Sequence, residues 1–259
     1  MSKQAFKRSE LEVDLNLELA HGGAKKYLTV STQDALAVAC AALRINGAYL
    51  KDTRRFSCEE NVTQFANKEL VKFYFAHTNR DRTDFGSLQV PTDFIPFETT
   101  EEDYAQVAEI QKWMKRYVML GLGDLDHFKK DMIATVSEDT VKVNNLGRVA
   151  YIPEFVNRDK HESGLKKEIR MEYRDSKHLG KDKDVVEGVV KILDKRFSAE
   201  WESYNYTAVI NGNLISFMNK YEHGVGDMIR IKGKVKALST NNMFAVPETR
   251  LNYVKITKV

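Results

Sequence analysis

The chain has 259 residues, of which 42% are hydrophobic and 30% are charged, with only four prolines. This composition is typical of a folded globular protein and argues against disorder, and no apolar run approaches the length that spans a bilayer. The N-terminus lacks the apolar core of a signal peptide, and the two cysteines, Cys40 and Cys58, exclude a disulfide framework. These features together predict a cytoplasmic protein.

The net charge of +3 is divided unevenly along the chain. Residues 1–157 carry a net charge of −3, residues 158–180 carry +2 and residues 181–259 carry +4. A basic end on a nearly neutral chain indicates nucleic acid as a candidate partner, although many ordinary barrels carry a charge of this size.

Residues 1–157 are predicted to form a mainly helical domain with an initial strand. Leu11–Leu19 alternates apolar and polar residues with a period of two, which predicts that strand. Ser31-x-x-Asp34 is typical of a helix start and Asn46-Gly47 of a helix end. Arg148–Ile152 is predicted as a short strand. Apolar residues at helical spacing predict helices over Gln33–Ile45, Glu59–His77, Glu101–Leu120 and Leu125–Val136.

A cationic segment lies early in the chain, at Ala48–Ser57. Lys51, Arg54 and Arg55 stand there between Tyr49 and Phe56. Cations meet phosphates and rings stack on bases, so this pattern suits a nucleic-acid platform. Short patterns of this kind arise by chance, and a solvated loop is the favoured interpretation.

Residues 158–183 are highly charged and have few apolar anchors. Helical spacing is present over Gly164–Lys177. We expect this segment to be a charged linker helix between the helical domain and the rest of the chain.

Residues 184–259 carry the signals of five short strands. Asn211-Gly212 between two apolar runs is a strong hairpin signal, and Gly188 within the first run indicates a bend or bulge. An α+β fold follows, in which the helical domain precedes a small five-stranded antiparallel OB-like β-barrel. The strands are predicted over Val185–Phe197, Tyr204–Ile210, Leu214–Asn219, Met228–Leu238 and Arg250–Val259.

The last third of the chain also resembles a known group of modules. The order Gly188-Val-Val…Gly226-Asp227…Gly233-Lys-Val-Lys236…Glu248-Thr-Arg-Leu251…Val254-Lys255 is similar to OB-like modules that end bacteriophage replication and recombination proteins. Such modules often carry a polar, cationic hairpin before the final Thr-x-Leu, whereas residues 241–247 are apolar here. That loop is therefore a candidate for contact with another domain or a partner.

The strand predicted at Met228–Leu238 is the strongest functional signal. Ile229, Ile231, Gly233, Val235 and Ala237 fall on one face, and a row of cations falls on the other. The row suits a phosphate backbone, although lysines also protect the edges of sheets. The candidate phosphate-binding residues are Arg230, Lys232, Lys234 and Lys236, with Lys191, Lys195 and Arg196 from the first strand.

Aromatic residues near these cations are candidates for stacking on bases. Each could instead belong to the barrel core, and for Phe217 the core is favoured. The candidates are Phe197, Trp201, Tyr204, Tyr206, Phe217 and Tyr253.

The motifs of catalysis are largely missing from the sequence. There is no P-loop and no nucleophile elbow, and the histidines are scattered without metal-ligand spacing. Asp124 and Asp126, near His127 and Asp131, form the one acidic cluster that could seat a divalent metal. Capping of the following helix is the favoured role for these carboxylates. We therefore expect no enzyme, no metal and no cofactor.

These patterns and the resemblance together predict non-catalytic binding of single-stranded nucleic acid, with DNA favoured over RNA, in phage-type DNA replication or recombination. The alternative is a protein-binding adapter. It would dock a polymerase, a helicase or a host factor through the barrel or through the loop at 241–247.

Overall fold

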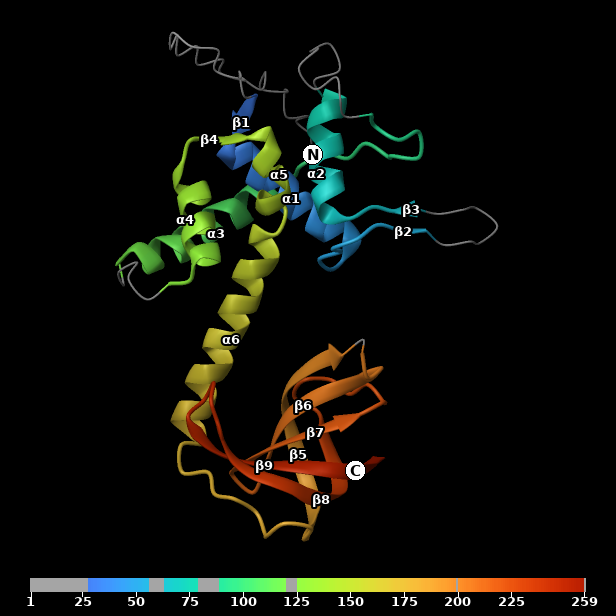
Figure 1. Cartoon of the computed structure of the whole chain (residues 1–259), viewed down its shortest axis with the longest axis vertical. Helices are drawn as coiled ribbons and strands as arrows, with labels where there is room; N and C mark the ends of the chain where they lie inside the picture. The colour runs from blue at the N-terminus through green and yellow to red at the C-terminus, as the bar shows by residue number, and fades with distance from the viewer. Residues whose placement is uncertain (1–27, 56–62, 79–88, 120–124, 199, 259) are drawn as a thin grey trace, which may run out of the picture. The chain divides into compact units, whose positions relative to one another are not determined.

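The computed structural model describes residues 28–55, 63–78, 89–119, 125–198 and 200–258 (Figure 1). The chain divides into two compact units, the first ending at Arg158 and the second beginning at Asp159. Helices form most of the described part of the first unit, and a closed barrel forms most of the second, so the fold is α+β. None of the described helices is long and apolar enough to cross a membrane.

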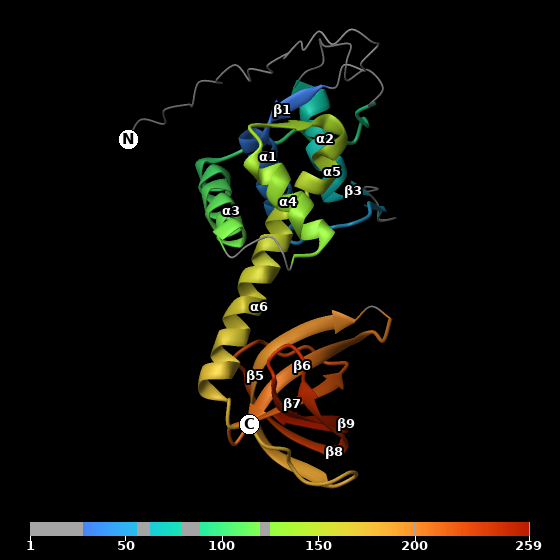
Figure 2. The ribbon, with the colours of Figure 1, turned by 60° about the vertical axis from the view of Figure 1, so that its left-hand side comes forward.

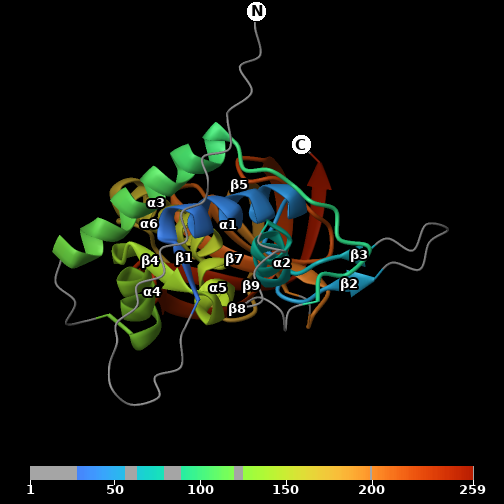
Figure 3. The ribbon, with the colours of Figure 1, turned by 90° about the horizontal axis from the view of Figure 1, so that it is seen from above.

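The first unit is built around α1 (Thr32–Asn46), which packs against α2 (Asn67–Thr78) and α3 (Glu101–Met119) (Figures 2 and 3). Two short antiparallel strand pairs complete it, β1 with β4 and β2 with β3. The remaining elements are β1 (Thr29–Ser31), β2 (Arg54–Arg55), β3 (Thr63–Gln64), α4 (His127–Ser137), β4 (Thr140–Lys142), the 3-10 turn η2 (Val143–Asn145) and α5 (Leu146–Val149).

The signals at the two ends of α1 act as the sequence predicts. The side chain of Ser31 accepts a hydrogen bond from Asp34 N, and Gly47 ends the helix in the left-handed conformation. The helix is rich in alanine and almost wholly buried, which allows its neighbours to approach closely. Its thiol, Cys40, is buried as well, and burial with a smaller contribution from Asp103 raises the pKa of that thiol to about 12.

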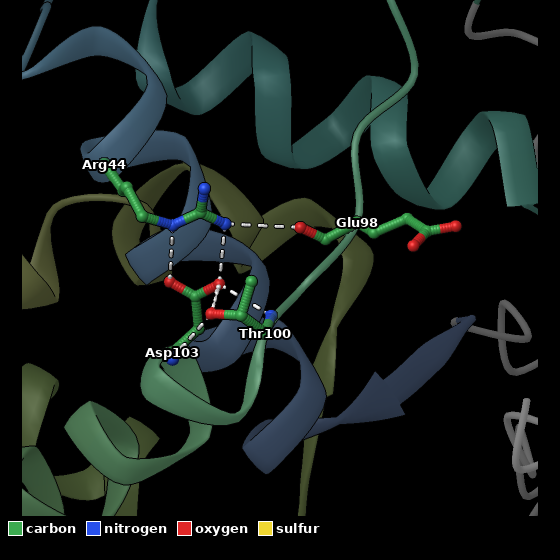
Figure 4. Close-up of polar contacts among 4 residues, drawn as sticks. All are labelled: Arg44, Glu98, Thr100 and Asp103. Atoms are coloured by element: carbon green, nitrogen blue, oxygen red, sulfur yellow. Dashed lines mark hydrogen bonds and ion pairs between the residues drawn. The ribbon is translucent and has the colours of Figure 1, made fainter. Parts of the chain in front are cut away.

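A buried ion pair joins α1 to the start of α3 (Figure 4). Arg44 donates to both carboxylate oxygens of Asp103, from Nε at 3.2 Å and from Nη2 at 2.8 Å. Thr100 N and Asp103 exchange hydrogen bonds as a capping box, at 2.8 Å and 3.3 Å. Burial alone would raise the pKa of Asp103, but the bonds from Arg44 and Thr100 outweigh it and lower that pKa.

Two predictions for the first unit are wrong. The predicted helix Glu59–His77 begins only at Asn67, because Thr63–Gln64 pairs with Arg54–Arg55 as a strand. Arg148–Ile152 is not a strand, because α5 occupies its start and Ile152 begins the next helix. Pro153 is tolerated in the first turn of that helix, where its missing N–H would have no partner within the helix. The predicted strand Leu11–Leu19 lies outside the described residues, as does Cys58.

The second unit begins within α6 (Ile152–Glu172), so residues 159–183 belong with the barrel. Leu165 and Ile169 of α6 pack on apolar side chains of the barrel, among them Phe244 and Val246. The segment after α6 is bonded to the barrel too: Leu179 N donates to Thr249 Oγ1 at 2.8 Å, and Lys183 N donates to Val235 O at 3.0 Å.

The barrel is closed in the order β5-β6-β7-β9-β8, with β8 pairing back to β5. Its sheet is mixed, not purely antiparallel as predicted, because β7 and β9 run parallel. Direction cannot alternate all the way round a closed ring of five strands, so one neighbouring pair must be parallel. The strands are β5 (Val185–Ser198), β6 (Ser203–Ile210), β7 (Asn213–Asn219), β8 (Met228–Asn241) and β9 (Val246–Lys258).

The local signals of the barrel are confirmed. Asn211 and Gly212 both have positive φ, 49° and 76°, as a tight turn between β6 and β7 requires. The bulge predicted at Gly188 is an exception, because the pairing is regular there and the register of β5 shifts between Ile192 and Asp194. Gly188 instead allows a close approach, since a Cβ there would lie 2.6 Å from Cδ1 of Ile210. In β8, Ile229, Ile231, Gly233 and Val235 are buried and the four cations between and after them are exposed.

A fragment of residues 159–259 should fold more stably than one of residues 181–259. The shorter fragment exposes Phe244 and Val246 and loses the bonds that Lys177 N and Leu179 N donate to the side chains of Asn213 and Thr249. Thermal melting followed by circular dichroism compares the two. Equal melting temperatures would show that α6 contributes nothing to the barrel.

Candidate nucleic-acid interface

A groove of about 360 Å³ lies on the barrel over β6, β7 and β9, beside the turn between β8 and β9. Asn205 and Thr207 of β6 line it, with Ser216 and Met218 of β7. These side chains face outward because they alternate with core residues on the same strands. The outward-facing side chains of these strands therefore line the groove.

Three cations border the groove, namely Arg196 of β5, Lys236 of β8 and Arg250 of β9. Arg196 is paired, with Asp194 at 3.1 Å and with Glu162 of α6 at 3.2 Å. No carboxylate among the described residues forms an ion pair with Lys236 or Arg250. Two cations at the margin are thus free to meet an anionic ligand.

Asp194 is the one acidic residue in the lining of the groove. Its side chain is buried, and its oxygens lie 2.9 Å from His161 Nε2 and 3.1 Å from Arg196 Nε. Because Arg196 offsets its charge, Asp194 does not make the groove acidic.

Tyr253 presents an open aromatic ring to the groove and is 81% exposed. Its φ of 52° is left-handed, which is unfavourable for a bulky residue. The pairing of β8 with β9 slips here, so that Tyr253 and Val254 both lie opposite Gly233. A Cβ at Gly233 would lie 2.8 Å from Val254 Cγ2, so this glycine makes room for the bulge. Bulges commonly re-aim side chains at functional sites.

The four cations of β8 lie in a row on its exposed face, and of these only Lys236 lines the groove. Lys232 pairs with Glu187 of β5 at 2.8 Å. In the register with β9, Lys232 stands opposite Lys255, and Arg230 stands opposite Thr257. The row thus reaches the groove through its last member, Lys236.

The two predicted lysines of β5 lie outside the lining of the groove. Lys191 is paired with Glu168 at 3.7 Å, and Lys195 with Glu222 at 2.6 Å. A bound phosphate would have to compete with these carboxylates. Lys191 and Lys195 are therefore weaker candidates for phosphate binding than Lys236 and Arg250.

The predicted aromatic residues separate into two groups. Tyr206 is 1% exposed and Phe217 is 3% exposed, so both belong to the barrel core and offer no free ring face. Tyr204 is half-buried between Phe197 and Tyr206, with ring centroids 5.1 Å and 6.2 Å away. Phe197 and Trp201 are exposed but do not line the groove.

Several residues of the groove are missing from the sequence-based candidates. Asn205, Met218, Arg250 and Asn252 are among its lining residues. Period-two alternation on β6, β7 and β9 carries a signal for them, because each is adjacent to a buried residue on its strand.

Two apolar residues of the loop at 241–247 are covered by the chain itself, whereas Met243 is half-buried and Ala245 is exposed. Phe244 is 3% exposed and Val246 is 4% exposed, and both pack with Leu165 and Ile169 of α6. Phe244 and Val246 are therefore not open to a partner in the structure described, while Met243 lines the groove.

The early acidic segment does not form a metal site within the described residues. Asp126 caps α4 by accepting from Lys129 N at 2.8 Å, as favoured, and Asp131 pairs with Arg148 at 3.2 Å. No group of three or more His, Cys, Asp and Glu side chains in the described part could hold a metal ion. Asp124 lies outside that part.

The cationic segment at 48–57 is partly described. Arg54 and Arg55 form β2 and are exposed, and Lys51 is exposed as well. The ring of Tyr49 packs edge-on against Tyr151, with centroids 5.0 Å apart. The described part therefore offers cations without a free ring beside them.

Comparison of the chain with models of protein families, with curated proteins and with solved structures gives no match.

Proposed function

We propose that the protein binds single-stranded nucleic acid on the groove of its barrel, without catalysis. The barrel would be of the OB type, in which the face of the second and third strands and two neighbouring loops bind oligonucleotides. Here the second and third strands are β6 and β7, and the turn between β8 and β9 is one of those loops.

The observation that carries the proposal is the combination of free cations with an open ring. Lys236 and Arg250 meet phosphates, and the exposed face of Tyr253 stacks on a base. Stacking requires bases that are not already paired and stacked in a duplex, which favours single strands.

The β8 row would extend the contact beyond the groove. Its four cations alternate along seven residues, Arg230 to Lys236, which is about 20 Å of strand. The choice of DNA over RNA, and of phage-type replication or recombination, rests on the sequence resemblance of residues 184–259. Replication or recombination proteins would then be its protein partners.

A competition titration tests the proposal. The full chain is titrated at about 50 mM salt into a fluorescent single strand of about 16 nucleotides, the upper end of the site size of one such barrel. Unlabelled single strand should displace the probe far better than a duplex of the same sequence. Absence of binding, or equal displacement by the duplex, would overturn the proposal.

A further inference from the structure

Four polar side chains line the groove without a hydrogen-bond partner in the described part of the chain. They are Asn205 and Thr207 of β6, Ser216 of β7 and Asn252 of β9. Oδ1 of Asn252 is buried as well, so an acceptor stands unpaired beside the floor of the groove. An unpaired buried acceptor is unfavourable, which makes its presence at this place informative.

Two polar residues elsewhere in the second unit show the usual pattern, although the buried Oγ of Ser203 lacks a partner as well. Asn213 Oδ1 accepts from Lys177 N at 2.7 Å, and Thr249 Oγ1 accepts from Leu179 N at 2.8 Å. Those side chains hold the segment before β5 against the barrel. Asn205, Thr207, Ser216 and Asn252 make no such bonds, so their hydrogen-bonding groups are available to a ligand.

The strand register sets these polar side chains between the cations. Thr207 stands opposite Ser216, and Ser216 stands opposite Arg250. Asn205 stands opposite Arg196. A bound nucleic-acid strand whose phosphates contact these cations therefore holds its bases over the amide and hydroxyl groups of the groove.

Stacking and hydrogen bonding have different consequences for recognition. A ring such as that of Tyr253 accepts every base, because every base has a π face. Amides and hydroxyls read the donors and acceptors of base edges, which differ between bases. A site that only held single strands would not need polar side chains with free hydrogen-bonding groups under the bases.

We infer that the groove is sequence-selective, and that Asn205 and Ser216 read base edges. This inference rests on the proposed binding of single strands. It makes the two residues determinants of specificity, distinct from the cations and from Tyr253, which set affinity for any strand.

The test compares homopolymers of deoxyadenosine, deoxycytidine and deoxythymidine, each of about 12 nucleotides, by fluorescence anisotropy. The wild-type chain should prefer one over another by about tenfold or more. In the Asn205→Ala, Ser216→Ala double variant the ratio should fall to about threefold or less, with little change for the weakest ligand. Thr240→Ala, on an exposed position of β8 outside the groove lining, is the control and should keep the wild-type ratio.

The outcomes separate the inference from the proposal beneath it. If no homopolymer binds, the proposed function itself fails. If all three bind equally, or if the preference survives in the double variant, binding stands and the selective reading by Asn205 and Ser216 is wrong. Circular dichroism of each variant verifies that the barrel remains folded.

Discussion

Replacement of Arg44 by methionine is expected to lower the free energy of unfolding of the first unit by about 3 kcal/mol at pH 7. The change leaves the carboxylate of Asp103, which is 0% exposed, without its charged partner. Breaking a buried pair in this way costs about 3–5 kcal/mol, and the lower end applies because the side chain of Arg44 is itself 41% exposed.

The difference in the free energy of unfolding between wild type and variant should shrink as the pH falls. In the wild type the pKa of Asp103 is lowered, so the pair stabilises the fold above the ordinary carboxyl pKa and is lost as pH falls through the lowered value. In the variant, burial acts without the bond from Arg44, so the pKa of Asp103 rises and its protonation relieves the buried charge. Wild type and variant should therefore converge as pH falls.

Urea denaturation followed by the fluorescence of Trp113, in a Trp201→Phe background, measures the first unit by itself. The matched control is Arg148→Met, which removes an exposed pair with Asp131 and should cost less than about 1 kcal/mol. Equal losses in the two variants would contradict the role assigned to the Arg44–Asp103 pair.

Replacement of Tyr253 by asparagine should weaken the binding of single strands by about 10- to 100-fold while leaving the barrel at least as stable. Stacking of one base is worth about 1–3 kcal/mol. The left-handed backbone at φ 52° is costly for tyrosine, whereas asparagine adopts it readily. Affinity and stability are thus predicted to respond differently to one substitution.

Anisotropy titrations and thermal melting check the two parts of this prediction. Tyr221→Asn is the matched control, because Tyr221 is 75% exposed but does not line the groove. An affinity loss of the same size in both variants would show that Tyr253 has no specific role in binding single strands. A fall in melting temperature for Tyr253→Asn would show that the tyrosine serves the fold.

Local signals in the sequence predicted the strands of the barrel, because these signals act between neighbouring residues. The alternation of β8 and the Asn211-Gly212 turn are examples. The strand predicted at Arg148–Ile152 failed because the apolar residues there serve helices, which their short run does not distinguish. The parallel pair of β7 with β9 depends on closure of the whole ring, which no local pattern encodes.

The groove was predicted only in part for a similar reason. Lys236 and Tyr253 were among the candidates, but Arg250 and Asn205 were not. Outward alternation marks each of them on its own strand, yet their meeting depends on the register of β7 with β9 and of β5 with β6. The backbone strain at Tyr253 arises from a bulge opposite Gly233, which is a property of the paired strands.

The most direct test of a groove that binds single strands is the dependence of affinity on salt between about 50 and 200 mM. Log affinity should fall linearly with log salt, and the Lys236→Gln, Arg250→Gln double variant should flatten the slope by about 1.4, which is about 0.7 for each phosphate contact removed. Lys232→Gln, Lys234→Gln removes the same charge outside the groove lining and should flatten it less. Greater flattening by the second pair would place the nucleic-acid strand along β8. An affinity that does not respond to salt would contradict the contact between the cations of the groove and phosphates.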